Sequence, residues 1–240
     1  MELQIDTAKQ ELRVDGKALD YYSKRSFEIL SREWLKVGWN ERYPYTFSWK
    51  GFPIIQIAED IIRAQEVIWR VKPDVIIETG VAHGGSVVFY SDLCPKVIGV
   101  EKDLHCRKQV EALGKAIYLI EGNSTAPEIV EQVESLINPG EKVMVFLDSF
   151  HSKEHVLKEL YAYSPFVSQD SYIVATDGSM EFLDVPRAIS DWTWNNPQQA
   201  VREFLKFHTE FFIDEPKWPF NKSDLTENVT HWPNAWLKRK

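Results

Sequence analysis

The sequence predicts an α/β protein built on a doubly wound, mostly parallel sheet. Short apolar runs alternate with amphipathic segments from residue 75 to residue 177, and the first apolar run ends in a glycine-rich turn. Alternation at this spacing is typical of strands joined by helical crossovers, which place helices on both faces of the sheet. We expect strands over 75–78, 97–101, 116–120, 143–148 and 172–177, with helices over 86–93, 104–113, 126–137 and 153–166.

The chain on either side of this core is expected to extend it. Residues 1–53 are predicted to form an N-terminal helical and aromatic extension, either a lid or an oligomerisation segment, and residues 54–240 the main domain. Two late strands should pair antiparallel at the sheet edge. The expected elements are a hairpin over 3–14, a helix over 26–37, an aromatic loop over 39–52, helices over 54–70 and 197–207, and strands over 211–213 and 235–238.

The composition restricts the class of protein. The net charge of -8 argues against a nucleic-acid-binding protein and against docking on an anionic membrane. Cys94 and Cys106 make no zinc or disulfide pattern, which is typical of a reducing compartment. The N-terminus lacks the basic and apolar regions of a signal peptide, and no apolar run has membrane-spanning length. A cytoplasmic enzyme is therefore expected.

The first expected strand runs into the turn that organises the predicted site. The pattern is Glu78-x-Gly80-x-x-x-Gly84, with Ser86 at the start of the next helix, and it differs from the G-x-G-x-x-G of dinucleotide-binding proteins. Glycines in such a turn let backbone N–H groups approach a ligand closely. Glu101 ends the second strand, about twenty residues on, where a carboxylate can accept hydrogen bonds from ribose hydroxyls.

These residues favour an adenosine-containing cofactor that carries no phosphate. Asn123 and Ser124 follow the third strand, where an amide can hold an adenine edge. Acidic residues suit the cationic sulfonium and amino acid end of S-adenosylmethionine (SAM), whereas NAD requires a tighter glycine turn against its pyrophosphate. We predict SAM as the cofactor, bound by Glu78, Gly80, Gly84, Ser86, Glu101, Asn123, Ser124 and Asp148.

Two acids end the fourth and fifth strands. Asp148 and Asp177 should converge, because neighbouring parallel strands end at the same edge of the sheet. Two carboxylates with water suit Mg²⁺ or a Ca²⁺-type ion, which would lower the pKa of a substrate hydroxyl and prepare it to attack the SAM methyl group. Asp148 and His151 are the predicted catalytic residues, with His151 as general base or as a residue that orients the site.

Simpler interpretations remain open from the residues alone. Asp148 can cap the following helix or touch only the cofactor, and Asp177 can be a turn residue before Gly178. His155 is expected on an ordinary helix face. A rival interpretation combines Asp148, His151 and His155 as a two-histidine, one-carboxylate iron site, although oxidative iron chemistry gives no reason for Glu101 or the glycine turn.

From about residue 54 to its end, the chain resembles the cephalosporin hydroxylase family. This resemblance implies a SAM methyltransferase fold and metal-binding roles for Asp148 and Asp177. The family includes rhamnosyl O-methyltransferases and antibiotic-tailoring enzymes. The family usually has Glu-Asp where this chain has Thr176-Asp177, and the lost carboxylate would weaken Mg²⁺ binding or shift a ligand to water or to the Thr176 hydroxyl. The matching segments are 65–66, 73–80, 84–86, 147–149, 151, 155–163, 196–205, 212–214 and 237–239.

The combined prediction is a SAM-dependent O-methyltransferase with a Rossmann-like class I fold that acts on a hydroxyl of a sugar or secondary metabolite, assisted by Mg²⁺. The alternatives are an N-methyltransferase on similar molecules, an iron-dependent hydroxylase and a non-catalytic SAM-fold protein. The aromatic segment 39–52 should cover the substrate pocket or form a subunit interface. Trp192, Trp194 and Trp218 should line the mouth of the same pocket or pack in the core. The aromatic extension also predicts a homo-oligomer.

Overall fold

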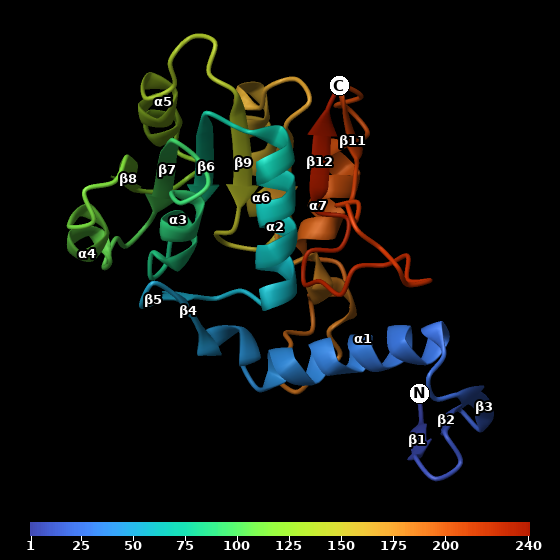
Figure 1. Ribbon diagram of the computed structural model, residues 1–240. Coiled ribbons are helices and arrows are strands. Elements are labelled where there is room, and N and C mark those ends of the chain that lie inside the picture. Colours follow the sequence, from blue (N-terminus) through green and yellow to red (C-terminus); the bar gives the residue numbers. More distant parts are fainter.

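The computed structural model describes all 240 residues and contains a central seven-stranded sheet (Figure 1). The strand order is β11-β12-β10-β9-β6-β7-β8, and the five strands from β10 to β8 run parallel. This confirms the predicted doubly wound core. The parallel strands are β6 (Val75–Thr79), β7 (Lys96–Glu101), β8 (Ile117–Glu121), β9 (Val143–Leu147) and β10 (Tyr172–Ala175).

Helices cover both faces of the sheet. One face packs against helices that precede or follow the first strands, namely α2 (Ala58–Val71), α3 (Gly85–Tyr90) and α4 (Arg107–Glu111). The other face packs against α5 (Pro127–Ser135), α6 (Lys153–Tyr163) and α7 (Pro197–Phe204). Strand β9 shows how the division arises, because its side chains alternate: Met144 and Phe146 enter the first core, and Val145 and Leu147 the second.

The last two strands form the predicted antiparallel pair. Strand β12 (Trp236–Arg239) pairs antiparallel with β10, and β11 (Phe211–Ile213) pairs with β12 at the edge. Short 3-10 helices occupy Ser164–Phe166 after α6 and Gly178–Phe182 after β10. The side chain of Asn196 caps α7 by accepting a hydrogen bond from the Gln199 backbone N–H at 3.0 Å.

The N-terminal region is more structured than the sequence indicates. It begins with a three-stranded sheet of β1 (Leu3–Asp6), β2 (Glu11–Val14) and β3 (Lys17–Asp20), of which the third strand was not predicted. The aromatic segment contains a 3-10 turn over Tyr43–Thr46 and a hairpin of β4 (Phe47–Trp49) and β5 (Phe52–Ile54). Because Ile54 belongs to β5, α2 starts at Ala58, four residues later than expected.

The helix that crosses below the sheet in Figure 1 is α1 (Lys24–Asn40). It buries Ser26, Ile29 and Leu35, whereas Phe27, Trp34 and Val37, which lie on one face by their spacing, are 45%, 40% and 62% exposed. The apolar spacing therefore predicted the helix but not the side that it buries. No helix of the structure combines the length and apolar character needed to cross a membrane.

Candidate active site

A cavity of about 810 Å³ opens at the carboxyl ends of the parallel strands. Its wall contains eight of the residues that the sequence predicted: Gly80, Ser86, Glu101, Asn123, Ser124, Asp148, His151 and Asp177. The end of α1, the turn after it and β5 form the opposite wall, together with Arg187 and His231. Segments from the N-terminal and C-terminal parts of the chain therefore meet over the strand ends. Ligands bind at this edge in open parallel sheets.

The glycine turn brings two strand-end loops into contact. Gly80 has φ +89°, and its N–H donates to the Val100 carbonyl at 2.8 Å. A Cβ at this position would lie 2.0 Å from the backbone oxygen of Asp148. Only glycine therefore fits between the loops after β6 and β9. Gly84, at φ +88°, is the N-terminal flanking residue of α3 and lies behind the cavity wall.

Glu78 also lies behind the wall rather than in it. Its side chain is fully buried and accepts a hydrogen bond from the Ser86 hydroxyl at 2.8 Å, while the other carboxylate oxygen has no partner. Burial raises the pKa of Glu78 well above its usual range, and the nearby Asp148 raises it further. Through Ser86, Glu78 orients the first turn of α3 at the cavity.

Glu101 lies at the end of β7, as expected for the acid that faces a ribose. One carboxylate oxygen accepts a hydrogen bond from the Ala82 backbone N–H at 2.8 Å, and the other accepts from Lys102 N–H at 2.7 Å. The first of these bonds ties the end of β7 to the glycine turn. The second oxygen also accepts from the Asp103 N–H at 3.5 Å, whereas the oxygen that faces Ala82 keeps a lone pair for a ligand, because each carboxylate oxygen can accept two hydrogen bonds.

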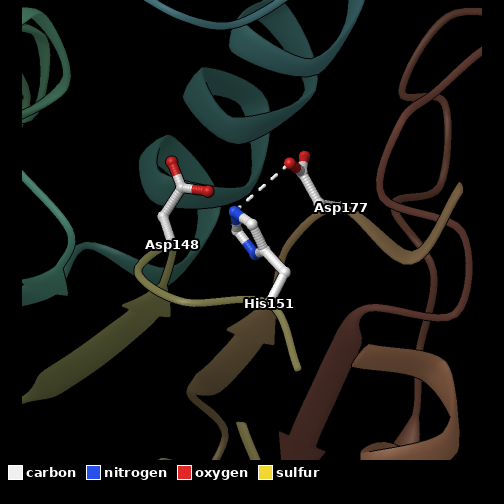
Figure 2. A group of neighbouring side chains, drawn as sticks. All are labelled: Asp148, His151 and Asp177. Atoms are coloured by element: carbon white, nitrogen blue, oxygen red, sulfur yellow. Dashed lines mark ion pairs between the residues drawn. The ribbon is translucent and has the colours of Figure 1, made fainter. Parts of the chain in front are cut away.

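Asp148, His151 and Asp177 all line the cavity, and their side chains point toward one another (Figure 2). Their ligand atoms lie within 4.8 Å of one another, and His151 Nε2 is 3.3 Å from Asp177 Oδ2. Asp177 has a left-handed backbone at φ 56°, which turns it out of the strand direction after β10. Two carboxylates and an imidazole at this spacing fit a divalent cation.

Two neighbours hold the Asp148 carboxylate. Gln56 donates from Nε2 to Asp148 Oδ2 at 2.7 Å, and the Thr176 hydroxyl donates to Asp148 Oδ1. Thr176 is buried behind the cavity wall, so in this structure it orients Asp148. Gln56 could not be recognised from the sequence, because it lies 92 residues before its partner. Asp148 does not cap α6, whose capping side chain is Ser152.

The protonation of the three groups reflects their shared burial. Burial raises the pKa of Asp148 and of Asp177, and the charge of Asp177 adds to the effect on Asp148. The hydrogen bonds from Thr176 and Gln56 oppose this shift by favouring the ionised carboxylate. Burial lowers the pKa of His151, and the nearby Asp148 offsets part of that change. The imidazole is therefore neutral near pH 7 and can accept a proton.

A second polar network borders the cavity beside this centre. Glu159 is fully buried, and its Oε1 accepts hydrogen bonds from the hydroxyls of Ser149 at 2.7 Å and Ser124 at 2.5 Å. His155 Nε2 lies 3.1 Å from the Ser149 hydroxyl. His155 thus lines the cavity and is not an ordinary helix-face residue. It is also absent from the cation-sized cluster, so the predicted Asp148, His151 and His155 iron constellation does not assemble.

The remaining wall faces away from the strand ends and is partly aromatic. Trp39 and Tyr45 line it, so part of the aromatic segment borders the cavity. Of the two alternatives for the other tryptophans, a place at the mouth is wrong, because Trp192, Trp194 and Trp218 are not in the wall. Trp192 instead packs edge-on against Trp39 with ring centroids 5.8 Å apart, and Trp194 is 62% exposed.

The strand order, glycine turn and strand-end acids together define a class I SAM-dependent methyltransferase. A family model described as rhamnosyl O-methyltransferase/CmcI matches residues 41–240, and the chain belongs to this family. The chain is similar to the rhamnosyl O-methyltransferase of Mycobacterium leprae, with 33% identity over 186 residues that cover 73% of this chain and 79% of the relative. It is 30% identical to that of Mycobacterium tuberculosis strain H37Rv over 208 residues, which cover 80% and 78%.

Solved structures of CmcI share the fold. A structure of CmcI without ligand superposes with a TM-score of 0.58 and 19% identity, covering 81% of this chain and 76% of the other. A structure of CmcI with Mg and SAM gives a TM-score of 0.57 and 17% identity, covering 82% and 77%. At these identities the similarity supports the fold, and the assignment to the family rests on the sequence matches.

Proposed function

We propose that this methyltransferase transfers the methyl group of SAM to a hydroxyl of a sugar or of a sugar-bearing natural product. The observation that carries the proposal is the meeting of Asp148, His151 and Asp177 in the same cavity as the glycine turn and Glu101. The names of the mycobacterial relatives, which are rhamnosyl O-methyltransferases, support a sugar hydroxyl as acceptor.

The cofactor lies along the ends of β6, β7 and β8 in this proposal. Glu101 accepts hydrogen bonds from the ribose hydroxyls, and the loop after β8, with Asn123 and Ser124, faces the adenine. The closely packed glycine turn presents its backbone to the amino acid end of the cofactor. Glu78 and Gly84 act from behind the wall by fixing the first turn of α3.

Asp148 and Asp177 are the proposed ligands of a divalent cation, with Mg²⁺ as the expected ion. Their carboxylates converge within the cation-sized cluster, and Gln56 and Thr176 hold Asp148 in place. A bound divalent cation supplies charge that lowers the pKa of the acceptor hydroxyl. Because Thr176 stands where related enzymes are expected to have a carboxylate, this chain offers one acid fewer to the ion.

His151 is the proposed general base. Its imidazole is neutral because burial lowers its pKa, and Nε2 is directed between the two carboxylates (Figure 2). From there it can take the proton of a hydroxyl that is placed against Asp148. The neutral hydroxyl thereby gains nucleophilic character as it approaches the methyl carbon, while the protein contributes mainly by positioning. An amine acceptor would need no such base once deprotonated, so His151 favours the O-methyltransferase over the N-methyltransferase alternative.

The test is methyl transfer with the purified protein. We expect that incubation with SAM and Mg²⁺, together with rhamnosides, other glycosides and sugar nucleotides, yields an acceptor that is heavier by one methyl group and S-adenosylhomocysteine in equal amount. Mass spectrometry detects both products. Binding of SAM without transfer to any hydroxyl, combined with transfer to an amine, would instead establish the N-methyltransferase. Binding without any transfer would support the non-catalytic alternative.

The N-terminal extension is the proposed contact between subunits of a homo-oligomer. Phe27, Trp34 and Val37 form an exposed apolar stripe on α1, next to the segment that covers the cavity. Burial of such a stripe between copies would stabilise the wall formed by Trp39 and Tyr45. Sedimentation of the wild type beside Val37→Glu tests this proposal, which predicts that the variant dissociates. A cytoplasmic location remains a prediction from the sequence.

A further inference from the structure

The side of the cavity opposite the strand-end acids carries two arginines without an acidic partner. Arg42 and Arg187 both line the cavity, and neither forms an ion pair. Two other basic side chains, Lys36 and Lys153, are paired: Lys36 lies 2.9 Å from Asp184, and Lys153 lies 2.7 Å from Glu203. Two free guanidinium groups thus face the same solvent-filled space in a protein whose net charge is -8.

The structure holds Arg187 in place while leaving its terminal nitrogens free. Its Nε donates to the Asn40 carbonyl at 2.7 Å, and its backbone N–H donates to Asn40 Oδ1 at 3.3 Å. Asn40 is the last residue of α1, so these bonds tie the loop after β10 to the end of that helix. No hydrogen bond engages the two Nη groups of Arg187. They remain available for a ligand in the cavity.

Arg42 lies two residues beyond the same helix end. Its backbone is left-handed, with φ 59° and ψ 35°, and its N–H donates to the Trp39 carbonyl at 3.0 Å. A non-glycine residue seldom adopts this conformation. The guanidinium lies 5.9 Å from the centre of the Tyr45 ring and makes no hydrogen bond to the protein. Arg42 and Arg187 are therefore anchored to one turn of the chain, and both present unsatisfied donors.

A planar guanidinium matches a phosphate or a carboxylate, because it can form two parallel charge-assisted hydrogen bonds. Two such groups that share a cavity repel each other until an anion lies between them. Asp148 and Asp177, which would repel an anion, belong to the central cluster at the strand ends. We propose that the acceptor carries a phosphate or carboxylate, held by Arg42 and Arg187, on the same molecule as the hydroxyl that is methylated.

This inference rests on the proposed function and deepens it by naming the class of acceptor. Trp39 and Tyr45, in the same wall, offer aromatic faces to the ring of a sugar or nucleoside. The acceptor is therefore a sugar phosphate, a nucleotide-linked sugar or a uronic acid rather than a neutral glycoside. A rival role for the arginines is to hold the carboxylate of SAM itself, which would also satisfy them.

Calorimetry on the full chain saturated with S-adenosylhomocysteine separates these possibilities. The probes are glucose 1-phosphate, uridine diphosphate glucose, glucuronate and neutral methyl glucoside. We expect at least one anionic probe to bind about tenfold more tightly than methyl glucoside, because charge-assisted bidentate contacts of this kind contribute on that scale. Comparison of the phosphorylated probes with glucuronate shows which anion the site takes.

Three variants locate the anion site. Arg42→Gln and Arg187→Gln should each weaken binding of the anionic probe about tenfold or more, with unchanged affinity for S-adenosylhomocysteine. Arg25→Gln is the matched control, because Arg25 lies at the start of α1 and pairs with Glu28 at 3.1 Å. It should bind the probe like the wild type.

Several results would overturn the inference. They are absence of anion binding at millimolar probe, equal affinity for the neutral probe, unchanged anion affinity in both arginine variants, and a selective loss of S-adenosylhomocysteine affinity in them. The last result would assign the arginines to the cofactor carboxylate. Failure of the wild type to bind S-adenosylhomocysteine at all would instead contradict the proposed methyltransferase. In that case, anion titrations repeated without S-adenosylhomocysteine would still show whether Arg42 and Arg187 bind the anionic probe.

Discussion

The proposed cofactor half of the cavity, with Gly80, Glu101 and Asp148, and the proposed acceptor half, with Trp39 and Arg187, are assembled in different ways. Each part of the cofactor half is a short loop that directly follows a strand, such as the turn from Gly80 to Ser86 or the residues after Leu147. The acceptor half joins residues that are far apart in the chain, including Trp39, Arg187 and His231. Loops that follow regular strands can be located from a sequence, whereas the residues of a wall that forms by tertiary packing cannot.

The two halves also differ in how tightly they constrain their residues. In the cofactor half, backbone meets backbone at Gly80, so no side chain is tolerated. In the acceptor half, Arg42, Tyr45 and Arg187 reach the cavity from exposed positions. Substitutions there change contacts to a ligand without disturbing the core. This difference suits an enzyme whose cofactor is constant and whose acceptor varies between relatives.

Replacement of Gly80 by alanine should have the largest effect. The new Cβ would meet the Asp148 carbonyl oxygen at 2.0 Å, and the residue would keep a φ of +89°. We expect Gly80→Ala to lower the free energy of unfolding by about 3 kcal/mol or more and to abolish SAM binding. Gly51→Ala is the control, because Gly51 has φ +87° with no atom within 4 Å of its Cβ position. It should cost only about 1 kcal/mol.

Equal stabilities of these two alanine variants in urea denaturation would show that the contact between the loops after β6 and β9 is looser than the structure indicates. The comparison isolates the contact between the residue 80 Cβ and the Asp148 backbone, since φ is nearly the same at Gly80 and Gly51.

Removal of the Asp148 charge should affect catalysis more than stability. Asp148→Asn keeps the shape of the side chain but loses a carboxylate from the cluster with His151 and Asp177. We expect kcat to fall by about a hundredfold or more and divalent cation binding to be lost. Asp224→Asn, an exposed site outside the cavity, should leave both unchanged. Full activity of Asp148→Asn would remove the metal role and the catalytic role together.

Loss of the residue that orients Asp148 should have a smaller effect. Gln56→Leu removes the hydrogen bond to Asp148 Oδ2, so we expect divalent cation affinity to fall about tenfold in calorimetry. Gln65→Leu, on α2 and without such a bond, serves as the control. An unchanged cation affinity in Gln56→Leu would mean that Thr176 alone orients the carboxylate.

The smallest effect concerns a buried acid that supports the acceptor half. Asp60 accepts hydrogen bonds from the Thr230 hydroxyl and from the His231 N–H at 2.9 Å, and burial raises its pKa to about 8. The folded state therefore retains a proton that the unfolded state has lost above about pH 4. The stability that this group contributes is complete at low pH and is lost as the pH rises through about 8.

Asp60→Asn should remove that dependence. Denaturation at about pH 5 and pH 8 should show a loss of stability that is larger for the wild type than for the variant, by on the order of 1–3 kcal/mol. Both proteins share the remaining loss, because Asp148 and Asp177 also have raised pKa values. The amide can donate to the Thr230 hydroxyl oxygen and accept from His231 N–H, so both partners stay satisfied. Identical pH profiles for the two proteins would show that Asp60 is ionised in the folded state.

Most of the fold and most residues of the proposed cofactor half could be predicted from the sequence. Apolar alternation located every core strand, and Glu101, Asp148 and Asp177 could be placed because strand ends share an edge. Gln56 was missed because its partner is distant in the chain. The exposed face of α1 was also missed, since amphipathic spacing predicts a stripe but not whether the same chain covers it. The positions of Trp192, Trp194 and Trp218 could not be predicted, because aromatic content alone does not show whether a side chain faces the pocket or the core.

Calorimetric titration with SAM tests the central claim most directly. We predict that the wild type shows a single saturable site at submillimolar SAM and that Glu101→Gln, which removes the charge facing the ribose, weakens it about tenfold. The glycine turn, Glu101 and the acids at the strand ends would then act as one cofactor site. Absence of binding heat at millimolar SAM, in protein shown to be folded, would contradict the assignment.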